Sequence, residues 1–258
     1  MPLPDPDLIV EKIRTAVSAD MTLHRDEEIE VLWAPFDHVN RNAGLAIVGV
    51  TPGPTQMSLS HAALKKALHE NRDPEADLAA IKAGSSFRGG TMEVNLKSLL
   101  EHAGIAEAAG IEDVDQLWTG ESDKVHFTSA LRYPTFFKGA PYNHDIDPLK
   151  HPFLREMVET LLAAELAALP RDAVIVALGS KNPRIVRHAA SLAGIDPERV
   201  RSICHPSPSS NGAVRNFLSG TRRRSRRPCR CFFCDDSRLP DGWTLRPEQL
   251  SRHDALHQ

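Results

Sequence analysis

Residues 43–54, AGLAIVGVTPGP, give the clearest indication of the fold class. The first eight of them form an apolar run, and Thr51-Pro52-Gly53-Pro54 ends that run. A short apolar run that stops at a Pro- and Gly-rich turn is typical of a strand buried on both faces. Strands of this kind belong to parallel sheets, which helices cover on each side. We therefore predict a strand over Ala43–Val50 that leads into a rigid turn.

Three further apolar segments repeat this pattern, and segments of helical composition separate them. Strands are predicted over Lys124–Leu131, Ala173–Leu178 and Val200–Cys204. Helices are predicted over Asp7–Met21, His61–Asn71, Pro74–Ala83, Val94–Ala103, Pro152–Leu169, Pro183–Leu192 and Asn211–Leu218. Residues 134–152 are predicted to be a long irregular segment. The alternation predicts an α/β fold, a three-layer α/β/α sandwich around a central, mainly parallel four-stranded sheet.

Length and composition favour one globular domain. The chain has 258 residues, 41% of them hydrophobic and 25% charged, which suits a single large α/β domain. We expect this domain over residues 1–220, with its core at 45–218, and an Arg- and Cys-rich extension over 221–258. No apolar run approaches the roughly 20 residues that span a bilayer, and the acidic, Pro-rich start does not resemble a signal peptide. We expect a cytoplasmic monomer with no membrane partner.

The charge distribution is more informative than the net charge of −3. Seven arginines and no acidic residue lie between Arg215 and Arg230. A chain with one strongly basic segment can bind phosphates even when its total charge is negative. The segment therefore indicates a nucleic-acid partner, and a solvated basic loop is the alternative.

Three of the predicted strands end in residues suited to a binding cleft. Gly49–Pro54 follows the first strand, Thr128-Ser129-Ala130 ends the second, and His205–Ser210 follows the last. In parallel sheets the ligand crevice lies beyond the carboxyl ends of the strands. Glycine lets the backbone approach a ligand closely, and proline stiffens the loop. We therefore expect these three segments to form one site.

These segments resemble the uracil-DNA glycosylase superfamily. GVTPGP (49–54) is similar to its first motif, especially in the mismatch-specific and single-strand-selective branches, and HPSPSS (205–210) is similar to the second. SSFRGG (85–90) resembles the loop that carries a base-stacking aromatic residue. VHFTSALRYP (125–134) resembles the central strand, and AVIVALGSKN (173–182) the strand and turn before the final helix. The resemblance covers about residues 45–218, with the segments in the family's order.

The resemblance implies hydrolysis of the N-glycosidic bond of a flipped-out uracil or other deaminated or damaged base in DNA. Negative charge develops on the departing base, and His205 would stabilise it as a hydrogen-bond donor. Phe87 would stack on the base. Substrate contacts would come from Gly49, Val50, Pro52, Gly53, Pro54, Ser129 and Ser207. The alternatives are a hydrogen-bonded turn histidine at position 205 and an ordinary core aromatic residue at position 87.

The loop after the second motif resembles the family's wedge, which enters the gap left by the flipped base. Val214 would be the apolar wedge and Arg215 a phosphate or gap contact. The alternative is a helix start that Asn211 caps. The full set of expected DNA contacts is Pro206, Pro208, Ser209, Asn211, Val214, Arg215, Arg222, Arg223 and Arg224. The expected DNA is single-stranded or a damaged duplex.

Two residues depart from the family pattern. Thr51 stands where most relatives have the Asp or Asn that activates or positions the attacking water. Threonine can hydrogen-bond a water but cannot act as a general base near neutral pH. Ser129 stands where many relatives have an Asn that grips the pyrimidine edge. Glu93, His144 and Asp145 are the residues nearest in sequence that could act as the general base instead of Thr51.

A cysteine cluster lies in the C-terminal extension. Cys229, Cys231 and Cys234 include the Cys-x-x-Cys spacing that suits a metal, with Cys204 or His253 as a fourth ligand; a reduced tail is the alternative. The implied hydrolysis itself requires no cofactor.

Two other functions are also consistent with the sequence. The departures at Thr51 and Ser129 favour a non-catalytic nucleic-acid-binding member of the same fold. A hydrolase of free nucleosides or nucleotides is the other candidate, although such a substrate needs no extended basic track.

Overall fold

The structure, a computed structural model, describes residues 21–70, 72, 74–105, 113–119 and 122–219. The helix predicted over Asp7–Met21 lies outside these ranges except for its last residue, and so does the Arg- and Cys-rich extension. In the described part of the chain, no helix combines the length and the apolar character that crossing a membrane requires.

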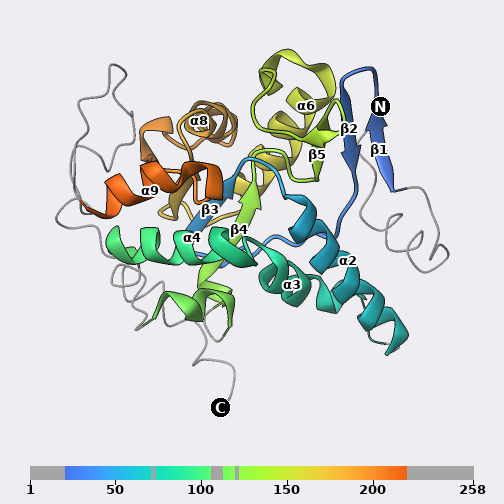
Figure 1. Cartoon of the computed structure of the whole chain (residues 1–258), viewed down its shortest axis with the longest axis horizontal. Coiled ribbons are helices and arrows are strands. Elements are labelled where there is room, and N and C mark those ends of the chain that lie inside the picture. Colours follow the sequence, from blue (N-terminus) through green and yellow to red (C-terminus); the bar gives the residue numbers. More distant parts are fainter. Residues whose placement is uncertain (1–20, 71, 73, 106–112, 120–121, 220–258) are drawn as a thin grey trace.

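A four-stranded parallel sheet forms the centre of the fold (Figure 1). Each of its strands lies within a predicted apolar run, and helices connect them along the chain. This confirms the predicted α/β class and the mainly parallel central sheet. The strands, in sheet order, are β4 (Val125–Ser129), β3 (Leu45–Gly49), β7 (Val174–Leu178) and β8 (Val200–Ile203).

Side chains of the central strand β3 alternate between two cores. Leu45 and Ile47 belong to the core that includes α4 (Gly90–His102) and α9 (Asn211–Leu218). Ala46 and Val48 belong to the other core. That second core includes α6 (Pro152–Glu156), a π-helical segment (Met157–Leu162), α7 (Ala163–Ala167) and α8 (Asn182–Leu192). Helices therefore cover both faces of the sheet, which explains why its strands are apolar without interruption.

A second sheet, which the sequence did not predict, lies beside the first. It is antiparallel, and it includes two short strands within residues 134–152. The prediction that this segment is irregular is therefore wrong in part. Its strands are only two to four residues long, and Ile29 pairs with Phe137, far away in sequence. In order they are β1 (Thr22–Arg25), β2 (Ile29–Leu32), β5 (Thr135–Phe137) and β6 (Ala140–Pro141).

The helix after β3 begins earlier than predicted. α2 (Pro54–His69) starts at Pro54 rather than at His61. The proline occupies the first helical position, where its fixed φ is favourable and its missing N–H costs nothing. Gln56 Oε1 accepts a hydrogen bond from Gly53 N at 3.1 Å, which satisfies a free donor at the helix start. The turn and the helix are thus one unit, and α3 (Pro74–Ser85) follows.

The central strand should dominate stability. Ile47 is fully buried, so Ile47→Ala leaves a cavity and should lower the free energy of unfolding by about 2–5 kcal/mol. Leu192→Ala is the matched control, because Leu192 is 55% exposed and its loss should cost only about 0.5 kcal/mol. Urea unfolding of both variants measures the difference. Equal losses would mean that β3 is not at the centre of the core.

Candidate active site

Three predicted site residues meet at the carboxyl end of β3. A Cβ atom at Gly49 would lie 2.8 Å from Phe87 Cε1 and 3.1 Å from Ser129 Oγ. Because carbon atoms do not approach this closely, only glycine fits at position 49 unless Phe87 shifts. The sequence placed these residues in separate segments, and the structure brings them into contact.

Phe87 is held in an unusual conformation. Its φ of 54° lies in the left-handed region, which is rare for a bulky residue and is often associated with functional sites. Its ring packs edge-on against Phe127, with the centroids 5.7 Å apart, and the residue is only 6% exposed. In this conformation the ring belongs to the core, so stacking on a base requires the loop to move.

The Thr51 hydroxyl joins two parts of the backbone. It donates to Tyr133 O at 2.9 Å and accepts from Thr135 N at 3.1 Å. These bonds tie the turn after β3 to the chain after β4. Since its one proton is used, Thr51 can bind a water only through its remaining lone pair.

His205 follows β8 directly and is neutral near pH 7. Its Nδ1 accepts a hydrogen bond from Ser207 N at 3.2 Å. The ring proton is therefore on Nε2, which leaves this atom free to donate. Burial lowers the pKa of His205. A Cβ at Gly179 would lie 3.5 Å from His205 Cβ, so the end of β7 supports the ring.

His144 lies near His205. Lys181, two residues after Gly179, donates from Nζ to His144 O at 3.4 Å. Burial, and then the charges of Lys181 and His205, lower the pKa of His144 to about 4. Like Phe87, it has a left-handed backbone, with φ 58°. Of the three proposed substitute bases, His144 is the one that interacts electrostatically with His205.

The other two candidate general bases, Glu93 and Asp145, are less suited to accept a proton from water. Glu93 accepts from Gly89 N at 2.9 Å and pairs with Arg88 and Lys97. Burial alone would raise its pKa, but these donors lower it to about 2. A carboxylate this acidic is a weak base. Asp145 is exposed and accepts from a backbone N–H.

The loop after His205 is exposed in part. Pro206 is buried, whereas Pro208, Ser209 and Arg215 lie at the surface. Ser207 Oγ lies 2.9 Å from Ser209 Oγ. These exposed side chains are accessible to solvent.

Two expectations for this loop are corrected by the structure. Val214 is 3% exposed and packs in the core with α4, so it does not stand where a wedge could enter a duplex. Asn211 begins α9 rather than capping it, and its Oδ1 accepts from Asn95 Nδ2 at 2.8 Å. Both corrections have one cause, since α9 turns its apolar side and its first residue toward α4.

The predicted basic and metal-binding residues of the extension lie outside the described residues. They are Arg222, Arg223, Arg224, Cys229, Cys231, Cys234 and His253. Cys204, the other suggested ligand, is buried next to the end of β8.

One group of described side chains has metal-ligand geometry. Candidate ligand atoms of His24, Asp26 and His151 lie within 4.8 Å of one another. However, both imidazole Nε2 atoms already contact Asp26 Oδ2, at 2.8 and 2.9 Å, and Asp26 Oδ1 accepts from the backbone N–H groups of Glu28 and Ile29. The carboxylate is therefore satisfied, and the group ties the β1–β2 turn to the start of α6.

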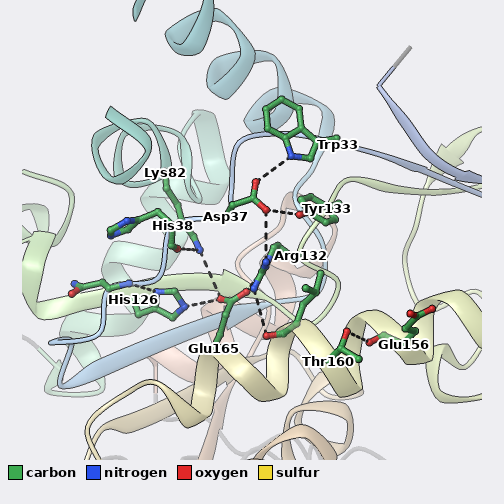
Figure 2. A network of polar contacts seen from close by, with 12 residues as sticks. Trp33, Asp37, His38, Lys82, His126, Arg132, Tyr133, Glu156, Thr160 and Glu165 are labelled. Carbon is green, nitrogen blue, oxygen red and sulfur yellow. Dashed lines mark hydrogen bonds and ion pairs between the residues drawn. The ribbon is translucent and has the colours of Figure 1, made fainter. Parts of the chain in front are cut away.

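A buried network of charged side chains, which the sequence did not predict, borders the site (Figure 2). At its centre is Glu165 of α7, which is 1% exposed. Its carboxylate accepts from Arg132 Nε and from His126 Nε2, the latter at 2.7 Å, and Lys82 Nζ lies 3.8 Å away. Burial alone would raise the pKa of Glu165, but the charges of Arg132 and Lys82 hold it well below its usual range.

A second carboxylate, Asp37, extends the network. It accepts from the Tyr133 hydroxyl and from Trp33 Nε1, and Arg132 Nη1 lies 3.7 Å away. Burial raises the pKa of Asp37. Burial also lowers the pKa of Lys82 to about 8, which leaves most of the ammonium protonated at pH 7. The sequence does contain a signal for this network, because single charged residues stand inside apolar stretches, as Glu165 does in LLAAELAAL.

The network meets the site at a small cavity beside the end of β4. Its volume is about 10 Å³, and Gln56, Lys82, Thr128, Ser129 and Arg132 line it together with Phe87. We call it the β4 cavity. It brings the predicted residues Pro52, Phe87 and Ser129 together with Gln56, Lys82 and Arg132, for which no functional role is predicted from the sequence.

Comparisons with known proteins leave the function open. No family model matches the chain. The uncharacterized protein YoxB of Bacillus subtilis (strain 168) is 28% identical over 159 residues, which are 61% of this chain and 62% of that protein. The match therefore spans less than two thirds of the relative's length. No solved structure matches significantly.

The network should make a large contribution to folding. Glu165→Gln keeps the shape of the side chain but leaves Lys82 and Arg132 without their shared counter-charge. Breaking a buried ion pair on one side typically costs about 3–5 kcal/mol, so we expect a loss of that size in the free energy of unfolding. Glu156→Gln, on the same helical segment, is the control, because the contact drawn for Glu156 in Figure 2 uses its backbone carbonyl, which accepts from Thr160 Oγ1 and is kept in the variant. A loss below about 1 kcal/mol would show that the charges are not coupled.

Proposed function

We propose that this chain is a DNA base-excision glycosylase with a uracil-DNA glycosylase-like α/β/α fold. It hydrolyses the N-glycosidic bond of a flipped-out uracil or another deaminated or damaged base. One observation carries the proposal. His205 is a neutral, mostly buried imidazole with its proton on Nε2, and it follows a strand whose sheet also positions Gly49 and Ser129.

The chemistry follows from these positions. A glycosylase extrudes its target nucleotide and reads the base in a pocket. When the bond breaks, His205 Nε2–H donates to the departing base and stabilises its negative charge. Gly49, which has no side chain, lets the substrate approach the backbone once the loop with Phe87 has moved, because the Phe87 ring lies against this position. The ring of His144 is neutral at pH 7, and it and Thr51 Oγ1 can each accept a hydrogen bond from the attacking water.

DNA is the partner in this proposal. Pro208, Ser209, Asn211 and Arg215 are exposed beside His205 in sequence, and the arginine-rich segment follows them along the chain. Serine and asparagine side chains and exposed helix starts commonly contact phosphates. The proposed substrate strand therefore runs over the start of α9.

Excision assays with and without His205 test the proposal. The substrates are oligonucleotides that carry uracil, hypoxanthine, xanthine or mismatched thymine. Removing a donor that stabilises transition-state charge typically costs about 10²–10³ in rate, so His205→Ala should lose this much. Thr51→Ala should lose less, because the Thr51 hydroxyl is bonded to the backbone. Single-turnover kinetics gives both rates.

His69→Ala is the matched control, since His69 is exposed at the end of α2. Thermal melts establish that each variant is folded. An equal or larger loss at Thr51 with normal folding would reverse the two assigned roles. If the wild type excises none of the four bases, the proposed glycosylase function is wrong.

The second candidate is a non-catalytic nucleic-acid-binding protein of the same fold. Specific observations favour it. The proton of Thr51 is used by the backbone, and the Glu93 carboxylate is paired with Arg88 and Lys97. Without rearrangement, neither residue can therefore act as the general base that activates the attacking water. This candidate predicts DNA binding without excision.

Salt dependence of DNA binding tests the contact that both candidates share. Each neutralised phosphate contributes about 0.7–0.9 to the slope of log K against log salt. The triple variant Arg222→Gln, Arg223→Gln, Arg224→Gln should therefore flatten the slope by about 2–3, as measured by fluorescence anisotropy on a single-stranded oligonucleotide. Arg171→Gln, outside the arginine-rich segment, is the control. A salt-independent affinity would exclude the proposed phosphate contacts.

A further inference from the structure

A second cavity, larger than the β4 cavity, lies beside the first half of β4. Its volume is about 340 Å³, a size typical of pockets that bind small molecules. Val125, His126 and Phe127 of β4 line it together with residues of α3. Ser129 lies at the other end of β4, so this cavity is separate from the predicted active site. We call it the α3–β4 pocket.

The walls of the pocket are largely apolar. Ala79 and Ala83 lie four residues apart on α3, so they share one face of the helix, and both line the pocket with Val125 and Phe127. Alanine side chains are short, which leaves room between this face of α3 and β4. Such walls favour an organic ligand over a bare inorganic ion, because the ligand's apolar surface is removed from water.

Lys82 contributes a positive charge to the lining. It is 4% exposed, and its Nζ donates to His38 O at 2.6 Å (Figure 2). Glu165 Oε2 lies 3.8 Å from the same nitrogen, which is beyond hydrogen-bond distance. Glu165 is also paired with Arg132, so its charge is shared between two cations. An ammonium carries three hydrogens, and Lys82 can therefore donate to a further acceptor.

His38 adds a second polar group. Its ring lines the pocket, and no hydrogen bond joins the ring to the described part of the chain. Burial, and then the charge of Lys82, lower the pKa of His38, so near pH 7 the ring is neutral and offers one N–H donor. By contrast, both ring nitrogens of His126 are occupied, one by Glu165 Oε2 and the other by Asn40 N.

The charges around the pocket define the ligand it favours. An anion gains the partly buried counter-charge of Lys82, whereas a cation is repelled by it. Asp123 is exposed and also lines the pocket, and its carboxylate disfavours a second negative charge on the ligand. These charges favour a singly charged anion, which a carboxylate is and a phosphate monoester at neutral pH is not.

We propose that the α3–β4 pocket is a second binding site of this protein and that its ligand is a small organic carboxylate. Lys82 pairs with the carboxylate, His38 donates a hydrogen bond to it, and the alanine face of α3 packs on the apolar body. The inference does not depend on the proposed glycosylase function. Lys82 lines the β4 cavity as well, so the ligand contacts a residue that also borders the predicted active site.

Three probes with the same ring test the charge preference. Benzoate is an anion, benzamide is neutral and benzylamine is a cation. In NMR titrations of the full chain at constant ionic strength, benzoate should bind at least about tenfold more tightly than benzamide, the effect of one charge-assisted hydrogen bond. Benzylamine should not bind. Equal affinities for benzoate and benzamide, or tighter binding of benzylamine, would rule out a carboxylate site.

A variant that fills the pocket locates the binding. Ala83→Leu places a larger side chain on the alanine face and should abolish benzoate binding without removing any polar group. Ala62→Leu, at an exposed position of α2, is the matched control and should bind benzoate as the wild type does. Thermal melts establish that both variants fold, and Ala79→Leu replaces Ala83→Leu if the latter does not. Unchanged benzoate binding in a folded filled variant places the ligand elsewhere and overturns the proposal.

The pH dependence identifies Lys82 without disturbing the network. The groups that face Lys82 are Glu165, Arg132, Asp37, His38 and His126. Burial lowers the pKa of Lys82 to about 8. Benzoate requires the protonated amine, so its affinity should fall about tenfold for each pH unit above 8, whereas binding to surface lysines would persist to about pH 10.

Two further results would contradict the proposal. An affinity for benzoate that stays constant up to about pH 9.5 would exclude Lys82 as the partner of the carboxylate. Inorganic phosphate is the comparison for ligand class. If phosphate binds more tightly than benzoate and Ala83→Leu abolishes this binding, the pocket is an inorganic anion site rather than a carboxylate site.

Discussion

The buried carboxylate of Glu165 is the interaction on which the rest of the structure depends. Lys82 of α3, His126 of β4 and Arg132 beyond β4 all converge on it from separate parts of the chain. Removing such charges from water costs several kcal/mol per ion, so the arrangement is stable only when every partner is present. The carboxylate therefore links α3 and α7 to the edge strand β4 and to the chain that follows it.

These links lie next to the site. The loop with Phe87 begins where α3 ends, two residues earlier, and Ser129 lies three residues before Arg132 in sequence. Ser129 pairs with Gly49 in the parallel register of β3 and β4, and the network anchors the neighbouring residues Lys82 and Arg132 around Glu165. Asn182 Nδ2 then secures the end of β3, donating to Val48 O and Gly49 O at 2.9 Å each.

The polar groups of the site differ sharply in how they are used. The Thr51 hydroxyl is hydrogen-bonded to the backbone, and the carboxylates of the network are paired with its cations. His205 Nε2, Gln56 Nε2 and the Thr128 hydroxyl are left with capacity to donate. The buried Asn182 Oδ1 at the end of β3 is an acceptor with no partner among the described residues. Spare donors suit a ligand that becomes negatively charged as it reacts. The proposed departure of a base as an anion has this property.

The four parallel strands and the residues that follow them could be predicted from sequence alone. A strand buried on both faces must be apolar throughout, and that pattern is local. Gly49, Ser129 and His205 could be predicted for the same reason, since strand ends share one edge of the sheet. The face that Val214 occupies, the pairing of β2 with β5 and the three partners of Glu165 became known from the structure. Those features depend on contacts between residues far apart in the chain, and local sequence patterns do not encode such contacts.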